Sequence, residues 1–390
     1  MKEFIIGKTP VKMWADTCDP TAWQQIENIC SLPFIHSHLA LMPDVHAGTG
    51  MTIGGVLATS GVVIPNAVGV DIGCGMCAVK TNTKVADIPR EVLRDVIVTG
   101  IRERIPVGMA HQTKVQPEQY LPQGFDIDKL PIVNQHYQVA RQMIGTLGGG
   151  NHFIELQRDT EGYLWIMIHS GSRQLGKKVG DYYNEKAKSL NARWYSSVSP
   201  EINLAFLPLD TPEFKAYWAE MEYCVQFALA NRALMIQRIE EVLSAAVPGI
   251  EFEPMINIAH NYAAWEKHFG KNVIVHRKGA TRVRQGEIGI IPGSQGTSSY
   301  IVDGLGNPLS FESCSHGAGR AMGRKEACRR LDLQSEIAKL DAKGVIHSVQ
   351  TVDDLEEAAS AYKDIDTVMA QQSDLVTIRT RLEPVAVVKG

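Results

Sequence analysis

Five histidines of this 390-residue chain stand in tight glycine-rich or polar turns. They are His46, His152, His169, His260 and His316. Glycine at such density indicates a backbone that turns sharply or approaches a ligand closely. Imidazole can bind a transition metal, move a proton or attack an electrophile. Taken singly, each is more often an ordinary turn or core residue, so the groups around them decide the chemistry.

A carboxylate and a thiol stand three residues apart at Asp71 and Cys74, in the turn Asp-Ile-Gly-Cys-Gly. Groups that close can point at one metal ion, although an aspartate that caps nearby amides would give the same pattern. With His152, His169 and His260, the set holds one thiol, one carboxylate and three imidazoles. Such a set could bind one or two transition-metal ions. The spacing does not choose among Zn, Fe, Co and Mn.

The segment Ser313-Cys314-Ser315-His316-Gly317-Ala318-Gly319-Arg320 places a histidine among small residues, and a helix is predicted over about 317–330. A helix N-terminus can hold an anion with its backbone N–H groups. Imidazole can attack phosphorus and form a phosphoramidate. Arg320 would lie one turn later on the same face, where it could neutralise phosphate charge. A histidine that only caps the helix is the alternative reading.

The elements that position these residues follow from hydrophobic periodicity and breakers. A long helix or broken pair is predicted at about 211–247, because Thr211 is a good cap and Pro212 suits the first helical position. The other predicted elements are helices near 85–100 and 131–144, a polar loop at 110–130, and strands at 56–57, 62–64, 164–169, 273–276, 288–291, 299–302 and 385–389. This irregular order predicts an α+β fold, and the lack of a linker predicts one domain over residues 1–390.

Composition limits the possible settings. The formal net charge is −4, so a nucleic-acid site would have to be a local basic patch on an acidic body. The seven cysteines are odd in number and form no disulfide framework, which favours a cytoplasmic protein. Cys77 is expected to pack in the core, since no second cysteine pair completes a zinc ribbon. The apolar stretch 54–75 is broken by proline, asparagine and aspartate, so no membrane association is expected.

Taken together, these motifs resemble those of the RtcB family of RNA-splicing ligases, nearly from end to end. The matching segments are Pro43–His46, Gly69–Gly75, Leu147–Glu155, His169–Arg173, His260–Tyr262, Arg277–Ala280, Ile291–Ser294, Ser315–Arg320, Ala361–Asp366 and Lys389–Gly390. The resemblance implies a single RtcB-like domain with mixed sheets around a deep polar metal-binding cleft. It also implies two Mn²⁺ ions, one held by Asp71, Cys74 and His152, the other by Cys74, His169 and His260.

The resemblance further implies a reaction. His316 would attack the α-phosphorus of GTP and carry the guanylate to an RNA 3′-phosphate, which a 5′-hydroxyl then attacks with loss of GMP. A 2′,3′-cyclic phosphate end would first be opened in the same site. Asp44 is a candidate acid/base or orienting group. The positions expected to line the nucleotide pocket are Asn151, Glu155, Ser294, Ser299, Gly317, Gly319, Arg320, Tyr362 and Lys389.

Two departures from the family pattern bear on the RNA surface. Relatives carry a longer and more basic stretch near residues 105–125, whereas Ile105–His111 is nearly neutral here and Lys114 is the only nearby base. In addition, Ala259 stands where a second histidine often occurs. The basic residues that remain as candidates for phosphate contacts are Arg173, Lys177, Lys178, Arg277, Lys278, Arg282, Arg284 and Arg324. A metal-dependent phosphoesterase that opens cyclic phosphates without ligation is the main alternative, and a non-catalytic RNA or nucleotide sensor is another. An archease-type activator accompanies some relatives.

Overall fold

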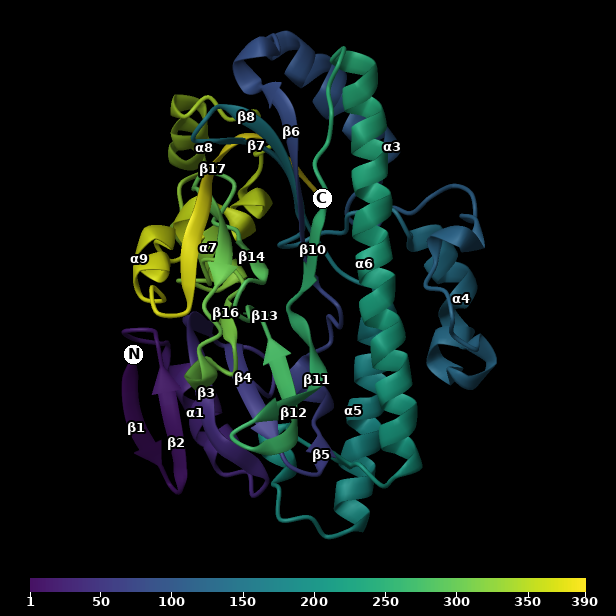
Figure 1. Cartoon of the computed structure of the whole chain (residues 1–390), viewed down its shortest axis with the longest axis vertical. Helices are drawn as coiled ribbons and strands as arrows, with labels where there is room; N and C mark the ends of the chain where they lie inside the picture. Colours follow the sequence, from purple (N-terminus) through teal and green to yellow (C-terminus); the bar gives the residue numbers. More distant parts are fainter.

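The computed structural model describes all residues 1–390 and contains two large sheets, one mixed and one antiparallel (Figure 1). The first sheet has the order β1-β2-β3-β4-β12-β11. Its strands are β1 (Lys2–Ile6), β2 (Thr9–Met13), β3 (Ile35–His46), β4 (Ile53–Thr59), β12 (Lys271–Lys278) and β11 (Asn261–His268). Only the β2–β3 pair is parallel, with helix α1 (Pro20–Cys30) in the connection between the two strands.

The second sheet has the order β10-β6-β8-β7-β17-β15-β14 and is antiparallel throughout. Its strands are β10 (Ile256–Ala259), β6 (Gly75–Lys84), β8 (Tyr163–Ser170), β7 (Phe153–Asp159), β17 (Val376–Lys389), β15 (Ser299–Gly304) and β14 (Ile288–Ile291). Two small ribbons complete the strands: β13 (Ala280–Arg282) with β16 (Ser313–Ser315), and β5 (Val62–Val63) with β9 (Leu207–Pro208). The α+β class is therefore confirmed.

Helix α6 (Pro212–Ala246) runs along the length of the molecule beside both sheets (Figure 1). The side chain of Thr211 accepts a hydrogen bond from the backbone N–H of Phe214, so the predicted cap and the predicted long helix are both confirmed. Tyr217, near its start, belongs to a core with Ile274 of the first sheet. Ile239, near its end, belongs to a core with Ile166 of the second sheet. One helix therefore packs against both sheets.

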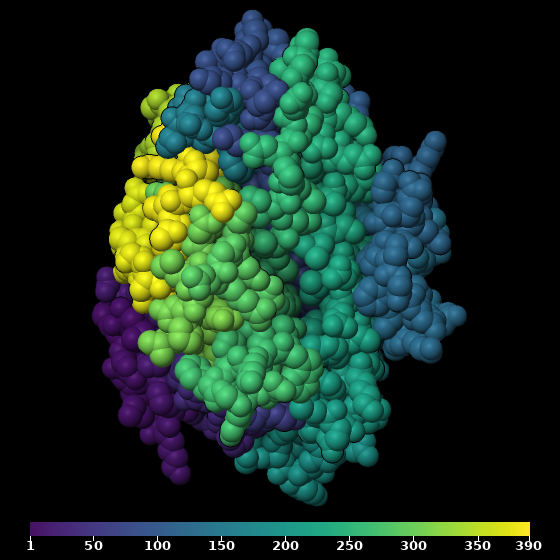
Figure 2. All heavy atoms as spheres, in the orientation of Figure 1, coloured from purple at the N-terminus to yellow at the C-terminus, as the bar shows by residue number.

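The remaining α-helices and one π-helix are shorter than α6, and the chain also contains several 3₁₀ turns. They are α2 (Pro65–Val68), a π-helix at Val92–Val98 that continues into α3 (Thr99–Arg104), α4 (Pro131–Met143), α5 (Leu175–Arg193), α7 (Arg324–Arg330), α8 (Leu333–Ala342) and α9 (Ile365–Ala370). Figure 2 shows the segment around α4, in blue, standing out on the side of α6 away from the yellow C-terminal segments. No helix is both long and apolar enough to cross a membrane.

One predicted helix was wrong in its start. Residues 317–323 are not helical, and α7 begins only at Arg324. Gly319 explains the difference: its backbone has φ +73°, and an added Cβ would lie 2.9 Å from the Cα of Asp44. Because it has no Cβ, Gly319 lets the chain lie directly against β3 in a backbone conformation that no α-helix has. His316 therefore directly follows β16 (Ser313–Ser315) rather than opening a helix.

Candidate metal centre and active site

The residues of the candidate metal centre lie together at the ends of neighbouring strands of the second sheet. Cys74 directly precedes β6, His152 directly precedes β7, and His169 stands one residue before the end of β8. Because these neighbouring strands are antiparallel, the start of one lies beside the end of the next. His260 directly follows β10, whose residue Ala259 pairs with Gly75, and it directly precedes β11 of the first sheet. The centre therefore lies where the two sheets meet.

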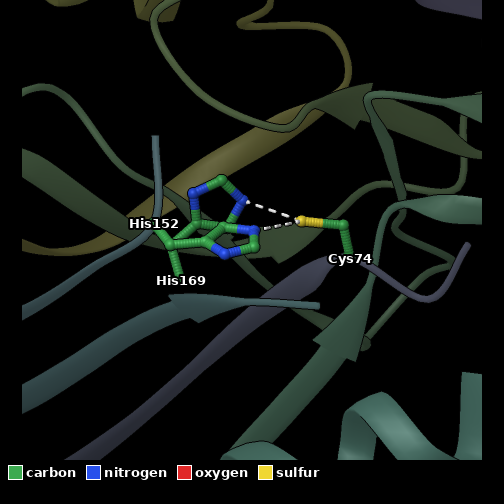
Figure 3. Close-up of side chains that lie close together, drawn as sticks. All are labelled: Cys74, His152 and His169. Atoms are coloured by element: carbon green, nitrogen blue, oxygen red, sulfur yellow. Dashed lines mark hydrogen bonds between the residues drawn. The ribbon is translucent and has the colours of Figure 1, made fainter. Parts of the chain in front are cut away.

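The ligand atoms of these side chains converge. The Sγ of Cys74 lies 3.5 Å from Nε2 of His152 and 3.2 Å from Nε2 of His169, and both rings face the thiol in Figure 3. Nε2 of His169 lies 3.4 Å from Nε2 of His260. An Asp71 carboxylate oxygen lies 3.5 Å from Nε2 of His152. The structure thus brings all five predicted ligand residues close together, and the ligand atoms of Cys74, His152 and His169 all lie within 4.8 Å of one another.

In two of the histidines, a hydrogen bond at Nδ1 orients the ring and leaves Nε2 free to bind a metal. Nδ1 of His152 contacts the carbonyl oxygen of Leu147, and Nδ1 of His169 contacts that of Asn151, each at 3.1 Å. A carbonyl only accepts, so each Nδ1 carries its proton and each Nε2 presents a lone pair. Nδ1 of His260 is buried without a partner.

The electrostatics of the cluster also fit a cation. Burial raises the pKa of the Cys74 thiol well above its usual range, and the Asp71 charge raises it further. Burial likewise holds the pKa values of His169 and His260 well below their usual range, so both rings are neutral. Burial alone would raise the pKa of Asp71, but its interactions, chiefly with the His152 ring, lower that pKa to about 2. Neutral imidazoles, a carboxylate and a thiol that needs a positive charge to ionise make a donor set that suits a transition metal.

His316 is held by Asp44 of β3. Its backbone N–H and its Nδ1 both donate to the same Asp44 oxygen, at 3.0 and 2.6 Å. Burial raises the pKa of Asp44, but its interaction and hydrogen bond with the His316 ring keep that pKa below its usual value. With Nδ1 engaged, the free nitrogen of the ring is Nε2. The His316 ring also lies edge-on to His260, with centroids 4.8 Å apart, so it adjoins the metal cluster.

A cavity of about 610 Å³ opens beside His316. His46 and His169 line it as well, so all five turn histidines lie in or next to this region. The predicted nucleotide-pocket residues in its lining are Asn151, Glu155, Ser294, Gly317, Gly319, Arg320, Tyr362 and Lys389. Ser299 alone of that set is outside the lining, since its side chain is buried behind the wall. There its Oγ accepts from the N–H of Gly293 at 3.2 Å and contacts Gln157.

The lining of the cavity includes a carboxyl group with an unusual pKa, that of Glu155. Burial raises the pKa of Glu155 to about 8, although Gln157 and the Lys389 charge lower it. Gln157 donates to Glu155 at 2.6 Å. Burial also lowers the pKa of Lys389. The cavity thus has a protonated carboxyl group at neutral pH in a wall otherwise rich in hydrogen-bond donors.

Glu357 was missed by sequence analysis and also lines the cavity. Its carboxylate accepts from Arg320 at 3.2 Å, from Arg324 at 2.9 Å and from the hydroxyl of Tyr362, and Lys389 lies 3.9 Å away. It therefore joins three of the predicted nucleotide residues. Glu357 stands in an acidic run with no motif around it, so only the fold reveals its position.

The candidate phosphate contacts outside this cavity are mostly engaged elsewhere. Arg277 is fully buried and forms a two-bond pair with Glu266, at 2.5 and 3.0 Å, so it cannot be a surface contact. Lys278 is buried against backbone carbonyls. Arg282 and Arg284 pair with Glu287 and Glu312, and Lys177 with Asp181. The basic residues that do line the cavity are Arg320, Arg324, Lys325, Arg329 and Lys389.

A thiol, a carboxylate and three imidazoles thus lie together at these strand ends, next to a polar cavity. This arrangement defines a candidate metalloenzyme site. The family described as tRNA-splicing ligase RtcB matches residues 25–126 and 124–390. The chain therefore belongs to the RtcB family. It is 39% identical to the RNA-splicing ligase RtcB of Escherichia coli K12, covering 98% of this chain and 97% of the relative. It is 32% identical to the tRNA-splicing ligase RtcB of Nanoarchaeum equitans (94% and 91% covered) and 31% identical to the RNA-splicing ligase RtcB of Mycobacterium tuberculosis (94% and 100%).

Proposed function

We propose that this protein is a GTP- and Mn²⁺-dependent RNA ligase that joins 2′,3′-cyclic phosphate or 3′-phosphate ends to 5′-hydroxyl ends. The observation that carries the proposal is the place of His316, which is hydrogen-bonded to a buried carboxylate and lines a polar cavity beside a cluster of metal-binding side chains. The names of its relatives, RNA-splicing and tRNA-splicing ligases, support the same reaction class.

The proposed metal ligands are Asp71, Cys74, His152, His169 and His260. Two Mn²⁺ ions bound there would offset the repulsion between phosphate groups and stabilise attacking and leaving oxygens. The chain itself contributes oriented imidazoles, because backbone carbonyls fix the Nδ1 protons of His152 and His169. It also places His169 in the lining of the nucleotide cavity, so bound phosphates would meet both sets of residues.

His316 is the proposed nucleophile. Its Nδ1 proton is held by Asp44, so the lone pair on Nε2 would attack the α-phosphorus of GTP. A bond from Nε2 to phosphorus forms as the bond from phosphorus to pyrophosphate breaks. Positive charge grows on the ring, and the Asp44 carboxylate stabilises it. The RNA 3′-phosphate then takes the guanylate from His316, and attack by the 5′-hydroxyl releases GMP.

The cavity lining suits a guanine nucleotide. Once ionised, the Glu155 carboxylate could accept from the two N–H groups on one edge of guanine. Arg320, Arg324 and Lys389 could balance the charge of the triphosphate. Asn151, Ser294, Gly317, Gly319 and Tyr362 are the other lining residues proposed to contact the nucleotide, with Ser299 supporting the wall from behind.

The test is incubation with GTP labelled at the α-phosphate and Mn²⁺, without RNA, followed by denaturing electrophoresis. We expect an acid-labile, alkali-stable label on the wild-type chain and none on His316→Ala. Exposed His111 offers a matched control, and His111→Ala should label like the wild type. A metal-loaded wild type that takes no label but opens cyclic phosphate ends would replace this proposal with the phosphoesterase.

We further propose that residues 1–390 act as one domain, because α6 packs against both sheets. All seven cysteines are unpaired, which suits the reducing cytoplasm. An archease-type activator is a proposed partner by analogy with the family.

A further inference from the structure

Two consecutive polar residues of α6, Asn231 and Arg232, are completely buried beside the candidate metal centre. A buried guanidinium is costly unless hydrogen bonds and compensating dipoles surround it. Arg232 is also one of the largest fully buried side chains of the molecule. The groups that these two side chains contact therefore indicate why the fold retains them.

Arg232 contacts the main chain next to two proposed ligands. Its Nη1 donates to the carbonyl of Gly73 at 3.1 Å and to the carbonyl of Ser170 at 2.7 Å. Gly73 directly precedes Cys74, and Ser170 directly follows His169. One nitrogen atom thus fixes the distance between the thiol segment and the end of β8.

The same guanidinium reaches the strand that ends at a third ligand. Nε of Arg232 donates to the side-chain oxygen of Asn257 at 2.7 Å. The side-chain nitrogen of Asn257 in turn donates to the carbonyl of Leu229 on α6, at 3.0 Å. Asn257 lies in β10, which is followed directly by His260. The position of β10 along α6 is therefore set by this pair of hydrogen bonds.

Asn231 holds the loop that leads to the fourth ligand. Its side-chain oxygen accepts from the N–H groups of Gly145 and Thr146, at 2.7 and 3.2 Å. Its side-chain nitrogen lies 3.2 Å from both the Thr146 carbonyl and the Ser170 hydroxyl. The loop after Thr146 ends at His152, so Asn231 ties the start of that loop to the end of β8.

We infer that the Asn231–Arg232 pair is the positioning element of the metal centre: two adjacent residues of one helix hold the segments that carry Cys74, His152, His169 and His260 in register. Neither residue is a proposed ligand, and the inference rests on the metal centre of the proposed function. Partners behind ligand side chains typically contribute 10- to 100-fold to metal affinity. We therefore expect metal affinity, rather than the GTP cavity, to respond first when this pair is changed.

The test measures Co²⁺ binding to the full chain, read from the thiolate-to-cobalt absorption band, together with Mn²⁺ affinity from the free-Mn²⁺ resonance signal. Arg232→Met should weaken binding of both ions about 10- to 100-fold and alter the cobalt band. Arg232→Lys keeps the positive charge but lacks the several N–H donors of the guanidinium, and should weaken metal binding less. The matched control is Glu220→Gln, on the same helix and equally buried, whose carboxylate accepts from the backbone N–H groups of Ile132 and Val133 at the start of α4.

Asn257→Ala provides a milder change should Arg232→Met fail to fold. It removes one acceptor of Arg232, and a several-fold loss of affinity is expected. Wild-type affinity and an unchanged cobalt band in folded Arg232→Met, or in both Arg232→Lys and Asn257→Ala, would overturn the inference. An equal loss in Glu220→Gln would overturn it as well, because a general weakening of α6 would then explain the effect.

These readouts separate the inference from the proposed function. A wild-type chain that binds metal in the way described, with Arg232 variants that bind weakly, supports the inference even if no RNA is joined. A wild type that takes up no Co²⁺ or Mn²⁺ overturns both.

Discussion

One oxygen of the Asp44 carboxylate accepts two hydrogen bonds from His316, one from the backbone N–H at 3.0 Å and one from Nδ1 at 2.6 Å. The first bond fixes where the chain turns after β16, and the second fixes which ring nitrogen carries the proton. The other Asp44 oxygen is buried without a partner. A single carboxylate thus determines both the position and the tautomer of the proposed nucleophile.

Asp44→Asn should impair labelling of His316 by GTP. An asparagine amide can donate to Nδ1, which would move the ring proton to Nε2 and remove the lone pair needed for attack. By comparison with hydrolase triads, in which this change has a known effect, the labelling rate should fall by roughly two to four orders of magnitude. Rapid-quench labelling measures it, and metal content should stay as in the wild type. A rate within twofold of the wild type would contradict the orienting role.

Cys74→Ser should release bound metal, because Sγ lies within 3.5 Å of two histidine nitrogens and is the proposed shared ligand. Elemental analysis after gel filtration should show both ions depleted. Cys77 is the matched control: it is fully buried three residues later on β6 and packs in the second-sheet core. Cys77→Ala should retain the metal with lower thermal stability. Equal metal content in the two variants would argue against Cys74 as a ligand.

GTP affinity should rise with pH through Glu155. Burial raises the pKa of this carboxyl group to about 8, so it is protonated below that pH and ionised above it. Only the ionised form can accept from both guanine N–H groups. The dissociation constant of a non-reactive GTP analogue should therefore fall as pH rises from 7 to 9. Glu155→Gln should flatten this dependence, and an unchanged slope in that variant would assign it to another group.

Glu357→Gln should lower stability and make it more dependent on nucleotide. The change leaves Arg320 and Lys389 without their buried counter-charge. A loss of about 1–3 kcal/mol in the free energy of unfolding is expected from charged hydrogen bonds of this kind. An anionic ligand would replace the missing charge, so pyrophosphate should raise the melting temperature more in the variant than in the wild type. Equal shifts would count against this account.

The sequence predicted those parts of the molecule that local patterns determine. α6 was predicted because its cap, its first-turn proline and its apolar spacing agree with its final environment. The ligand set was predicted from glycine-rich motifs, and the structure brings those residues together. Helix α5 (Leu175–Arg193) was absent from the prediction: Gly176 and Gly180 weaken its pattern, yet Gly180 allows close packing on Val70.

Features that depend on contacts distant in sequence were not accessible. The helix predicted after His316 starts seven residues late, because Gly319 is drawn against β3 across more than 270 residues of chain. Glu357 acquires its partners only when the C-terminal segments meet around the cavity. Arg232 belongs to no motif in the sequence, and only its burial and contacts reveal what it holds. In each case the deciding neighbour lies on another element.

The membership of α6 in both hydrophobic cores has a consequence for how the molecule comes apart. Unfolding of this helix on heating would separate the two sheets. Because Asn231 and Arg232 lie on the helix, the segments that carry the ligands would separate in the same event. We therefore expect no local unfolding of the site alone, and thermal unfolding should be a single cooperative transition. Any ion that binds only the assembled segments would shift that transition upward with its concentration.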